Sequence, residues 1–305
     1  MSVFSLLPLF LFVQKVWSTV PDDEIRWYKL SLRRTELGLI DAFNYYRSHG
    51  IEPILIKGWA AARNYPPDKP RFFGDVDLAV SPDRFDFAES VLSHPEFPRV
   101  GVDLHRGLRH LDTVEFETLY SRSLQIDIDG TMIRTLRPED HLRVLCVHWL
   151  TDGGAYKERL WDIYYAVANR PNNFDWNLCL NSVSETRRKW MVTTIRLAEK
   201  YLGLDASDLP FADESSQIPD WLTRTLETEW ATDVRLRPLH TCLRDRKAFF
   251  RQILKRLPPN PIQATIDVEG KFDERSRIPH QLGSIFVRTA PSIKRIFKTT
   301  FGKKR

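Results

Sequence analysis

The chain has 305 residues, 42% hydrophobic and 12% aromatic, a composition that can fill one large or two modest cores and excludes a disordered protein. Its three cysteines are far apart and form no CxxC pair, which excludes a disulfide framework or a zinc knuckle and predicts a cytoplasmic location. The net charge of +5 is concentrated at one end, since residues 241–305 carry +11 and the other 240 residues −6, which disfavours long nucleic acid as a partner of the body.

An apolar run over residues 3–13 is the first feature along the chain. No basic segment precedes it and no clear cleavage site follows it. At about 11 residues it is also shorter than the roughly 20 that span a bilayer. We therefore predict a buried helix here, with a targeting or membrane-contacting segment as the alternative.

Helical spacing of apolar residues predicts a helix from Asp22 to His49, closed by a glycine C-cap at Gly50. An apolar, β-branched strand is expected over residues 51–56, followed by the dipeptide Lys57-Gly58. One or two helical turns over 59–65 then lead through a polar loop to a second strand over 75–80.

The sequence Ser81-Pro82-Asp83 is typical of a helix start, with Ser81 as the N-cap, and predicts a helix to about Ser93. Another strand is expected over 100–105. Alternating residues over 124–128 and 131–133 flank Asp129-Gly130, which is a strong signal for a two-residue β-hairpin.

Beyond Pro138 the pattern is helical, until a proline-rich break at residues 258–261. The predicted fold class is α+β, with a small mixed sheet, a helical N-terminal extension and a helical C-terminal domain. We expect four segments: a helical extension over 1–50, an α/β domain over 51–137, a helical domain over 138–257 and a basic tail over 258–305.

Two acidic residues on the second strand are the first candidates for chemistry. Asp75 and Asp77 are two positions apart, so their side chains point to the same face of a strand. Like charges this close repel each other unless a cation lies between them, and oxygen ligands are what Mg²⁺ prefers. The alternative is an edge strand with a solvated acidic face.

The dipeptide Lys57-Gly58 adds a candidate phosphate site. It lies where a strand gives way to a helix, a place where backbone N–H groups attract phosphate. Gly58 allows a close backbone approach, and Lys57 contributes a positive charge. Alone the pair predicts only a turn; its position before the acidic strand makes it informative.

Together these segments resemble the uncharacterised nucleotidyltransferase family, which belongs to the DNA polymerase β-like nucleotidyltransferase superfamily. The most specific segments are ILIKGWAA over 54–61 and PRFFGDVDLAV over 70–80. Further matching segments are VDLH (102–105), LRPED (136–140), VHW (147–149), RLWDI (159–163) and IPHQLGSIFVR (278–288). The resemblance covers residues from about 37 to 298.

The resemblance implies a palm-like sheet with three metal-binding carboxylates, taken here by Asp75, Asp77 and Asp103. The cofactor would be Mg²⁺ or Mn²⁺, and the substrate an NTP whose NMP is transferred to an acceptor. The residues expected at the nucleotide are Lys57, Gly58, Arg71 and Gly74. The positions that match the family and could play an accessory part are His105, His148 and Asp162.

Several alternatives stay open. Asp127 and Asp129 form a rival pair on one strand face, although Asp129-Gly130 fits a turn. His105, His148 and Asp162 would look the same as ordinary hydrogen-bonded residues. The acceptor is not specified by the sequence, and a small molecule or a peptide fits best.

Two functions of other classes compete with an enzyme. A degenerate member of the same fold would bind a nucleotide or a partner without turnover. Alternatively, the basic end, where residues 241–305 have 16 Lys and Arg against 5 Asp and Glu, would make the protein a membrane-associated scaffold. Residues 283–305 alternate apolar and basic side chains and would contact an anionic membrane or an acidic partner; the alternative is a solvated helical face that ends in a frayed basic terminus.

Overall fold

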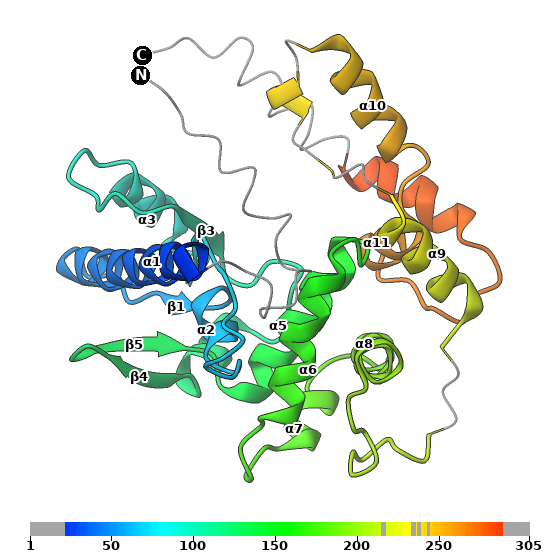
Figure 1. The fold of residues 1–305 in the computed structure, drawn as a ribbon, viewed down its shortest axis with the longest axis horizontal. Helices are drawn as coiled ribbons and strands as arrows, with labels where there is room; N and C mark the ends of the chain where they lie inside the picture. Colours follow the sequence, from blue (N-terminus) through cyan, green and yellow to red (C-terminus); the bar gives the residue numbers. More distant parts are fainter. Residues whose placement is uncertain (1–21, 215–217, 233–235, 237–238, 243–244, 289–305) are drawn as a thin grey trace. The chain divides into compact units, whose positions relative to one another are not determined.

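The computed structural model describes residues 22–214, 218–232, 236, 239–242 and 245–288. Over these residues the fold is α+β, as predicted, with a five-stranded mixed sheet and a larger share of helix (Figure 1). The chain forms two compact units, one comprising residues 1–145 and 161–183 and the other residues 146–160 and 184–305. The apolar run over 3–13 and the end of the basic tail, 289–305, lie outside the described residues.

The first unit contains the sheet. Its elements are α1 (Asp22–Ser48), β1 (Ile54–Leu55), α2 (Trp59–Ala62), β2 (Val76–Val80), α3 (Phe85–Leu92), β3 (Val102–Arg106), α4 (Phe116–Ser121), β4 (Leu124–Ile128), β5 (Thr131–Thr135), the start of α5 (Pro138–Thr151), most of α6 (Leu160–Ala168) and α7 (Trp176–Asn181). The strand order is β3-β2-β1-β5-β4. Strand β2 is parallel to β3 and β1 to β5, whereas β1–β2 and β4–β5 are antiparallel.

Helix α1 ends as the sequence predicts. Gly50 has a φ of 70°, which glycine adopts at little cost. Its N–H donates to the Arg47 carbonyl (2.9 Å), and the N–H of Ile51 donates to the Tyr46 carbonyl (3.0 Å). These two bonds form a Schellman motif, and the accompanying apolar contact is supplied by Ile51 and Tyr46, both in the core. The motif turns the chain directly into β1.

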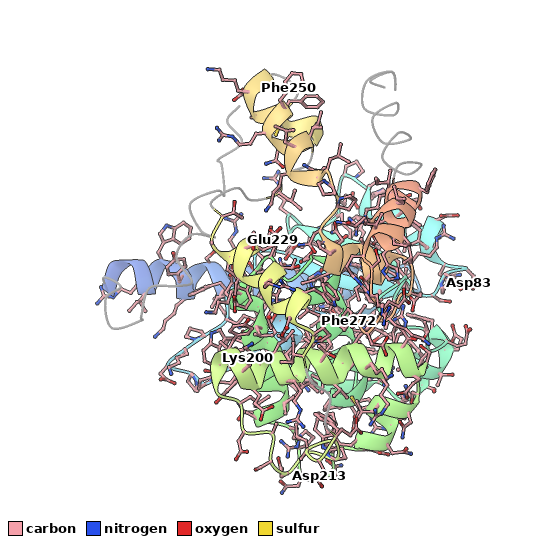
Figure 2. The ribbon with its side chains drawn as sticks, turned by 90° about the vertical axis from the view of Figure 1, so that its right-hand side faces the viewer. Asp83, Lys200, Asp213, Glu229, Phe250 and Phe272 are labelled. Carbon is pink, nitrogen blue, oxygen red and sulfur yellow. The ribbon has the colours of Figure 1, made fainter. Side chains whose placement is uncertain are left out.

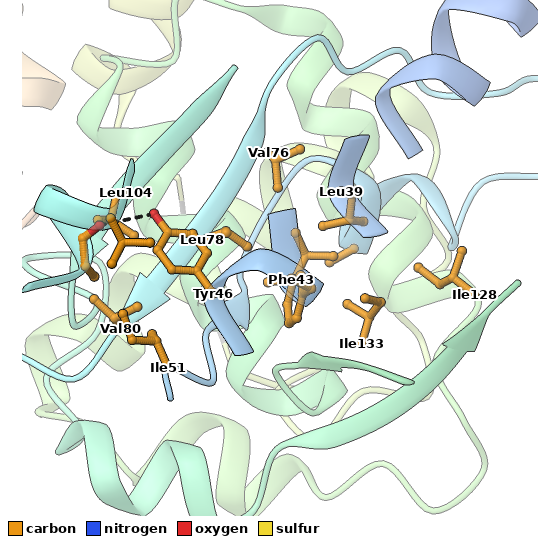
Figure 3. Close-up of a cluster of buried hydrophobic side chains, with 14 residues drawn as sticks. Leu39, Phe43, Tyr46, Ile51, Val76, Leu78, Val80, Leu104, Ile128 and Ile133 are labelled. Atoms are coloured by element: carbon orange, nitrogen blue, oxygen red, sulfur yellow. Dashed lines mark hydrogen bonds between the residues drawn. The ribbon is translucent and has the colours of Figure 1, made fainter. Parts of the chain in front are cut away.

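The core of the first unit lies between α1 and one face of the sheet (Figure 3). Its members share full or nearly full burial and come from α1, the strands and α3. The residues labelled in the figure are Leu39, Phe43, Tyr46, Ile51, Val76, Leu78, Val80, Leu104, Ile128 and Ile133. Alternate residues of β2 therefore face the core, which leaves Asp77 on the opposite face.

The predicted hairpin is present. Strands β4 and β5 pair from Ile128 with Thr131 outward, and the two residues between them, Asp129 and Gly130, have φ values of 51° and 79°. Two positive φ angles in succession are those of a type I′ turn, whose twist matches that of the strands.

The predicted start of the third helix is wrong. Helix α3 begins at Phe85 rather than at Ser81. Residues 81–84 form a turn instead, in which the Arg84 N–H donates to the Ser81 carbonyl (3.0 Å). The Ser81 hydroxyl is engaged by the carboxylates of Asp83 and Glu117, so it caps no helix. Local acceptors competed with the helix for this serine.

The second unit is helical in its described part. It contains the end of α5, the 3₁₀ turn η3 (Lys157–Arg159), α8 (Glu185–Leu202), α9 (Asp220–Trp230), η4 (Leu239–Cys242), α10 (Arg246–Arg256), α11 (Pro261–Asp267) and a helical segment over 278–288. Helix α11 starts as helices after a proline break do, with Asn260 as N-cap and Pro261 in its first turn. Among the described helices, none has both the length and the apolar content needed to cross a bilayer.

Candidate active site

The pairing of β2 with β3 brings two of the three candidate carboxylates together. The strands are parallel, with Asp77 opposite Asp103 and Ala79 opposite His105. Because side chains alternate along a strand, Asp77, Asp103 and His105 all project from the face of the sheet that the core does not use. Hydrogen bonds between backbones thus set the distance between these side chains.

The three side chains are close enough to share one cation. One ligand atom from each of Asp77, Asp103 and His105 lies within 4.8 Å of the others. The His105 Nε2 is 3.0 Å from Asp103 Oδ2 and 3.7 Å from Asp77 Oδ1. Neither ring nitrogen makes a well-aligned hydrogen bond within the described residues, although the ring is buried. The approach to Asp103 is therefore mainly electrostatic, and the imidazole has capacity for a ligand.

Lys57 joins this cluster from the strand-to-helix turn. Its Nζ lies 2.7 Å from Asp77 Oδ1, and both side chains are about nine-tenths buried. An unpaired charge is costly in such a place, so each group compensates the other. Lys57 was predicted at the nucleotide phosphates, and here its charge is held at the edge of the carboxylate cluster.

The turn itself requires a glycine. The Ala60 N–H donates to the Lys57 carbonyl (3.0 Å), and Gly58 has φ 57° and ψ −111°, the angles of the first central residue of a type II′ turn. A Cβ on Gly58 would lie 3.3 Å from the Asp75 carbonyl oxygen and 3.5 Å from Asp77 Oδ2. The Gly58 backbone therefore lies directly against the acidic strand.

Asp75 takes the third place in the predicted set, at the entrance of the cluster. It precedes the first residue of β2, its side chain is exposed, and it is not one of the three groups within 4.8 Å. Loss of surrounding water raises the pKa of Asp75, and the negative charge of Asp77 raises it further, against the opposing charge of Lys57.

The other pKa shifts follow from the same charges. Burial alone would raise the pKa of Asp77, but the contacts with His105 and Lys57 outweigh it and hold the pKa below its usual value. The contact with His105 also lowers the pKa of Asp103. Burial would lower the pKa of His105, yet Asp103 and Asp77 outweigh it and raise that pKa. Asp77 and Asp103 thus favour the charged form of His105, and His105 in turn favours the charged forms of both carboxylates.

Arg71 and Asp162 form a second layer behind the glycine turn. The guanidinium of Arg71 contacts the carboxylate of Asp162 through two bonds, Nε to Oδ1 (2.6 Å) and Nη2 to Oδ2 (2.9 Å). Its Nη1 lies 3.4 Å from the Gly58 carbonyl oxygen. Tyr65 donates its hydroxyl to the same carboxylate (2.7 Å). Arg71, predicted to assist the phosphates, is thus fixed against the turn by an aspartate 91 positions away.

The rival pair lies elsewhere in the first unit. Asp127 is on β4, and strands β1 and β5 separate β4 from β2. Its Oδ1 accepts the N–H of Gly130 (3.0 Å), so it supports the hairpin turn. Asp129 occupies that turn and pairs with Arg33. Of the two rivals Asp103 and Asp127, only Asp103 lies on a strand that pairs with the strand of Asp77.

Two predicted residues are not part of this cluster. Gly74 is exposed, and a Cβ there would meet nothing within 4 Å. His148 lies on the part of α5 that belongs to the second unit. Two groups that the sequence did not single out are Tyr65 and His141, which is completely enclosed near Ile56 and Asp162. Only the spatial contact with Asp162 distinguishes Tyr65 from other tyrosines.

The donor set fits a divalent cation. Two carboxylates of adjacent strands and a buried imidazole each offer a ligand atom within 4.8 Å of the other two. Hard carboxylate oxygens favour Mg²⁺ or Mn²⁺.

Sequence comparison agrees with this arrangement. Residues 32–203, more than half of the chain and including the whole cluster, match a family described as uncharacterised nucleotidyltransferase, and the chain belongs to this family. No curated protein matches the sequence significantly. Among solved structures, a crystal structure of an antigenic nucleotidyltransferase-like protein from Paracoccidioides brasiliensis is similar, with 15% identity over 55% of this chain and 90% of the other and a TM-score of 0.41.

Proposed function

We propose that the protein transfers a nucleoside monophosphate from an NTP to an acceptor, using a divalent cation held by Asp75, Asp77 and Asp103. The observation that carries the proposal is the β2–β3 register, which sets Asp77 beside Asp103 with Lys57 and Gly58 against them. Membership of a nucleotidyltransferase family supports the class of reaction.

In this proposal Asp77 and Asp103 are the principal ligands, Asp75 completes the set and His105 borders it. A bound Mg²⁺ or Mn²⁺ would supply charge neutralisation at the phosphates and activation of the acceptor oxygen. The ammonium group of Lys57 is paired with Asp77. A bound triphosphate would give this ammonium group a second anionic partner. Gly58 lets the phosphates approach the backbone closely, where a side chain would be in the way.

The paired side chains of Arg71 and Asp162 act through the turn. Their two-bond contact orients Arg71 so that its third nitrogen faces the Gly58 carbonyl. They are positioning residues in this scheme, since no distance places them at a reacting atom.

The acceptor is proposed to be a small molecule or a peptide, because the acidic body does not suit a long nucleic acid. Contact of residues 283–305 with an acidic partner also stays a prediction.

The test is release of pyrophosphate from each of the four NTPs with Mg²⁺ or Mn²⁺, using cell extract as the source of acceptors and mass analysis of the product. Asp77→Asn and Asp103→Asn should abolish turnover, because each removes a ligand charge. Asp127→Asn is the matched control, since its carboxylate lies on β4 and should leave turnover unchanged. Nucleotide binding by calorimetry without pyrophosphate release from any NTP would instead establish a binding module of the same fold.

A further inference from the structure

Helix α10 in the second unit presents an apolar face to solvent. Three large apolar side chains, Phe250, Leu254 and Leu257, are 63%, 72% and 55% exposed. Phe250 and Leu254 are four residues apart and lie on one side of α10, and Leu257 follows directly after the helix as its extended C-cap. Figure 2 labels Phe250 on this helix. Scattered exposed apolar residues are ordinary, but a stripe of this kind on one short helix marks a contact surface.

Basic residues lie on the same side. Lys247 and Arg251 are exposed and fall, by helical geometry, in the same sector as Phe250 and Leu254. Within the described residues no carboxylate pairs with either of them. The sequence supports this charge, because residues 246–266 contain five Lys and Arg and no Asp or Glu.

The other side of α10 holds the helix to its unit. Gln252 is buried, and Lys255 contacts Glu229 of α9 through an Nζ–Oε2 distance of 2.7 Å. The exposed side is therefore the one that the described fold leaves without packing. The helical segment over 278–288 repeats the pattern, with Ile278, Leu282 and Phe286 exposed at intervals of four residues.

We propose that this face of α10, comprising Lys247, Phe250, Arg251 and Leu254, together with the C-cap residue Leu257, binds the surface of an anionic lipid bilayer. The chemistry matches, since apolar side chains enter the boundary between headgroups and acyl chains while lysine and arginine contact anionic headgroups. Helix α10 is about 16 Å long, too short to span a bilayer but suited to lying in its plane.

Charge and area disfavour a protein partner on this face. A second copy bound through a two-fold axis would bring another Lys247 and Arg251 into the same interface, where α10 offers no acidic residue to compensate them. One helix about 16 Å long and roughly 10 Å wide presents on the order of 200 Å², against about 800 Å² per partner in a stable interface. A lipid surface requires no such matched area, because each inserted side chain contributes independently.

The direct test is a fluorescence shift at a single labelled position of the full chain. The three native cysteines are buried, so Leu254→Cys can be labelled selectively with an environment-sensitive dye. We expect a blue shift when phosphatidylcholine vesicles containing phosphatidylserine are added, and none with pure phosphatidylcholine. The control Phe87→Cys, at an exposed apolar position of α3, should show no shift.

Binding should also depend on both kinds of side chain. In co-sedimentation, Arg251→Glu should weaken binding to anionic vesicles more than tenfold, since removing one basic residue near the surface costs about fivefold and the new acid adds repulsion. The control Arg224→Glu, on an exposed position of α9, changes the charge equally and should have little effect. The double variant Phe250→Ser/Leu254→Ser should lose the binding, unlike Phe87→Ser/Leu124→Ser.

Three outcomes would overturn the proposal. Sedimentation with vesicles without a shift at position 254 would place the lipid contact on another segment. A shift that appears at high protein concentration without vesicles would make a second copy the occupant. A shift caused by an acidic polypeptide and not by vesicles would assign the face to a protein partner. None of these measurements involves NTP, so they do not depend on the proposed transfer reaction.

Discussion

Arg143 is an almost fully enclosed charged side chain in the first unit. Only 1% of its side chain is exposed, and its Nε lies 2.8 Å from Asp112 Oδ2. It also pairs with the buried Asp140, which Arg122 contacts as well. This network fastens the start of α5 to the loop before α4. Each buried charge in this network has a partner of opposite charge. Removal of any one member would therefore leave another charge buried without a partner.

We therefore expect Arg143→Ala to lower the free energy of unfolding by about 3–5 kcal/mol, because Asp112 would keep a buried charge with no cation beside it. Denaturant titration followed by circular dichroism measures this change. The exposed pair of Asp86 with Arg106 provides the control, and Asp86→Asn should alter stability little. Equal effects of the two substitutions would contradict the role given to Arg143.

His141 makes stability depend on pH. Burial lowers the pKa of His141 to about 3, and the nearby charges of Arg63 and Arg71 act in the same direction. The unfolded chain binds this proton near pH 6.5 and the folded chain does not, so stability falls as pH drops below 6.5.

Between about pH 6 and 4, His141 should reduce stability by about 1.4 kcal/mol for each unit of pH lost. Denaturation midpoints of the wild type and of His141→Gln, compared across this range, isolate the effect because all other groups titrate in both proteins. The variant should show the smaller slope. Parallel curves would show that this histidine titrates normally.

At the scale of single elements, the turn between β1 and α2 ties backbone conformation to the site. Gly58→Ala should lower stability by about 1–3 kcal/mol for the unfavourable φ and ψ, and should also prevent nucleotide binding, because its Cβ would press on the Asp75 carbonyl and on Asp77. Gly130→Ala is the control. Gly130 also has a positive φ, but no atom lies within 4 Å of the added Cβ. Calorimetry with an NTP and Mg²⁺ should show binding lost in the first variant and kept in the second.

The ends of helices and strands show which local features the sequence predicts correctly. The end of α1 at Gly50 and the hairpin at Asp129-Gly130 are confirmed, because each depends on residues that are near in sequence. The start of α3 was wrong, because a serine that can cap a helix was used by a turn. Short sequence patterns predict local structure well. They fail where a side chain such as that of Ser81 has more than one nearby hydrogen-bond partner.

The candidate site shows the same division. The acidic strand and the glycine turn are visible as short motifs, whereas the β2–β3 register that pairs Asp77 with Asp103 is a property of the folded sheet. The contact of Arg71 with Asp162 joins positions 91 residues apart, and no spacing rule predicts it. The roles of Asp75, Asp77, Asp103 and Lys57 in catalysis stay predictions, as do the four segment boundaries.

At the scale of the whole molecule, the two compact units alternate along the chain. Residues 146–160 belong to the second unit, and their partners there come much later in the sequence. Gly154 illustrates this: its carbonyl accepts the indole N–H of Trp230 (2.8 Å), and a Cβ on it would lie 2.2 Å from Leu226. Similarly, the Thr151 carbonyl accepts from Gln263 (2.7 Å).

A fragment of residues 22–203, which contains all of the family match, should therefore be less stable than the full chain and prone to self-association. It keeps the residues around Trp149 and Gly154 but loses α9 and α11, which cover them. Size-exclusion chromatography and limited proteolysis of both proteins measure the difference. A monomeric fragment as resistant to protease as the full chain would contradict this prediction.

The backbone ladder between β2 and β3 has a consequence for how this chain tolerates change. Since the ladder fixes the carboxylates of Asp77 and Asp103 opposite each other, the segment between the strands does not set their separation. Extra sequence could be spliced in at the exposed turn around Pro95 and Glu96 without moving either carboxylate. Removal of Val102 from β3, by contrast, would shift the following residues by one position. Leu104 would then point away from the core and Asp103 would point into it.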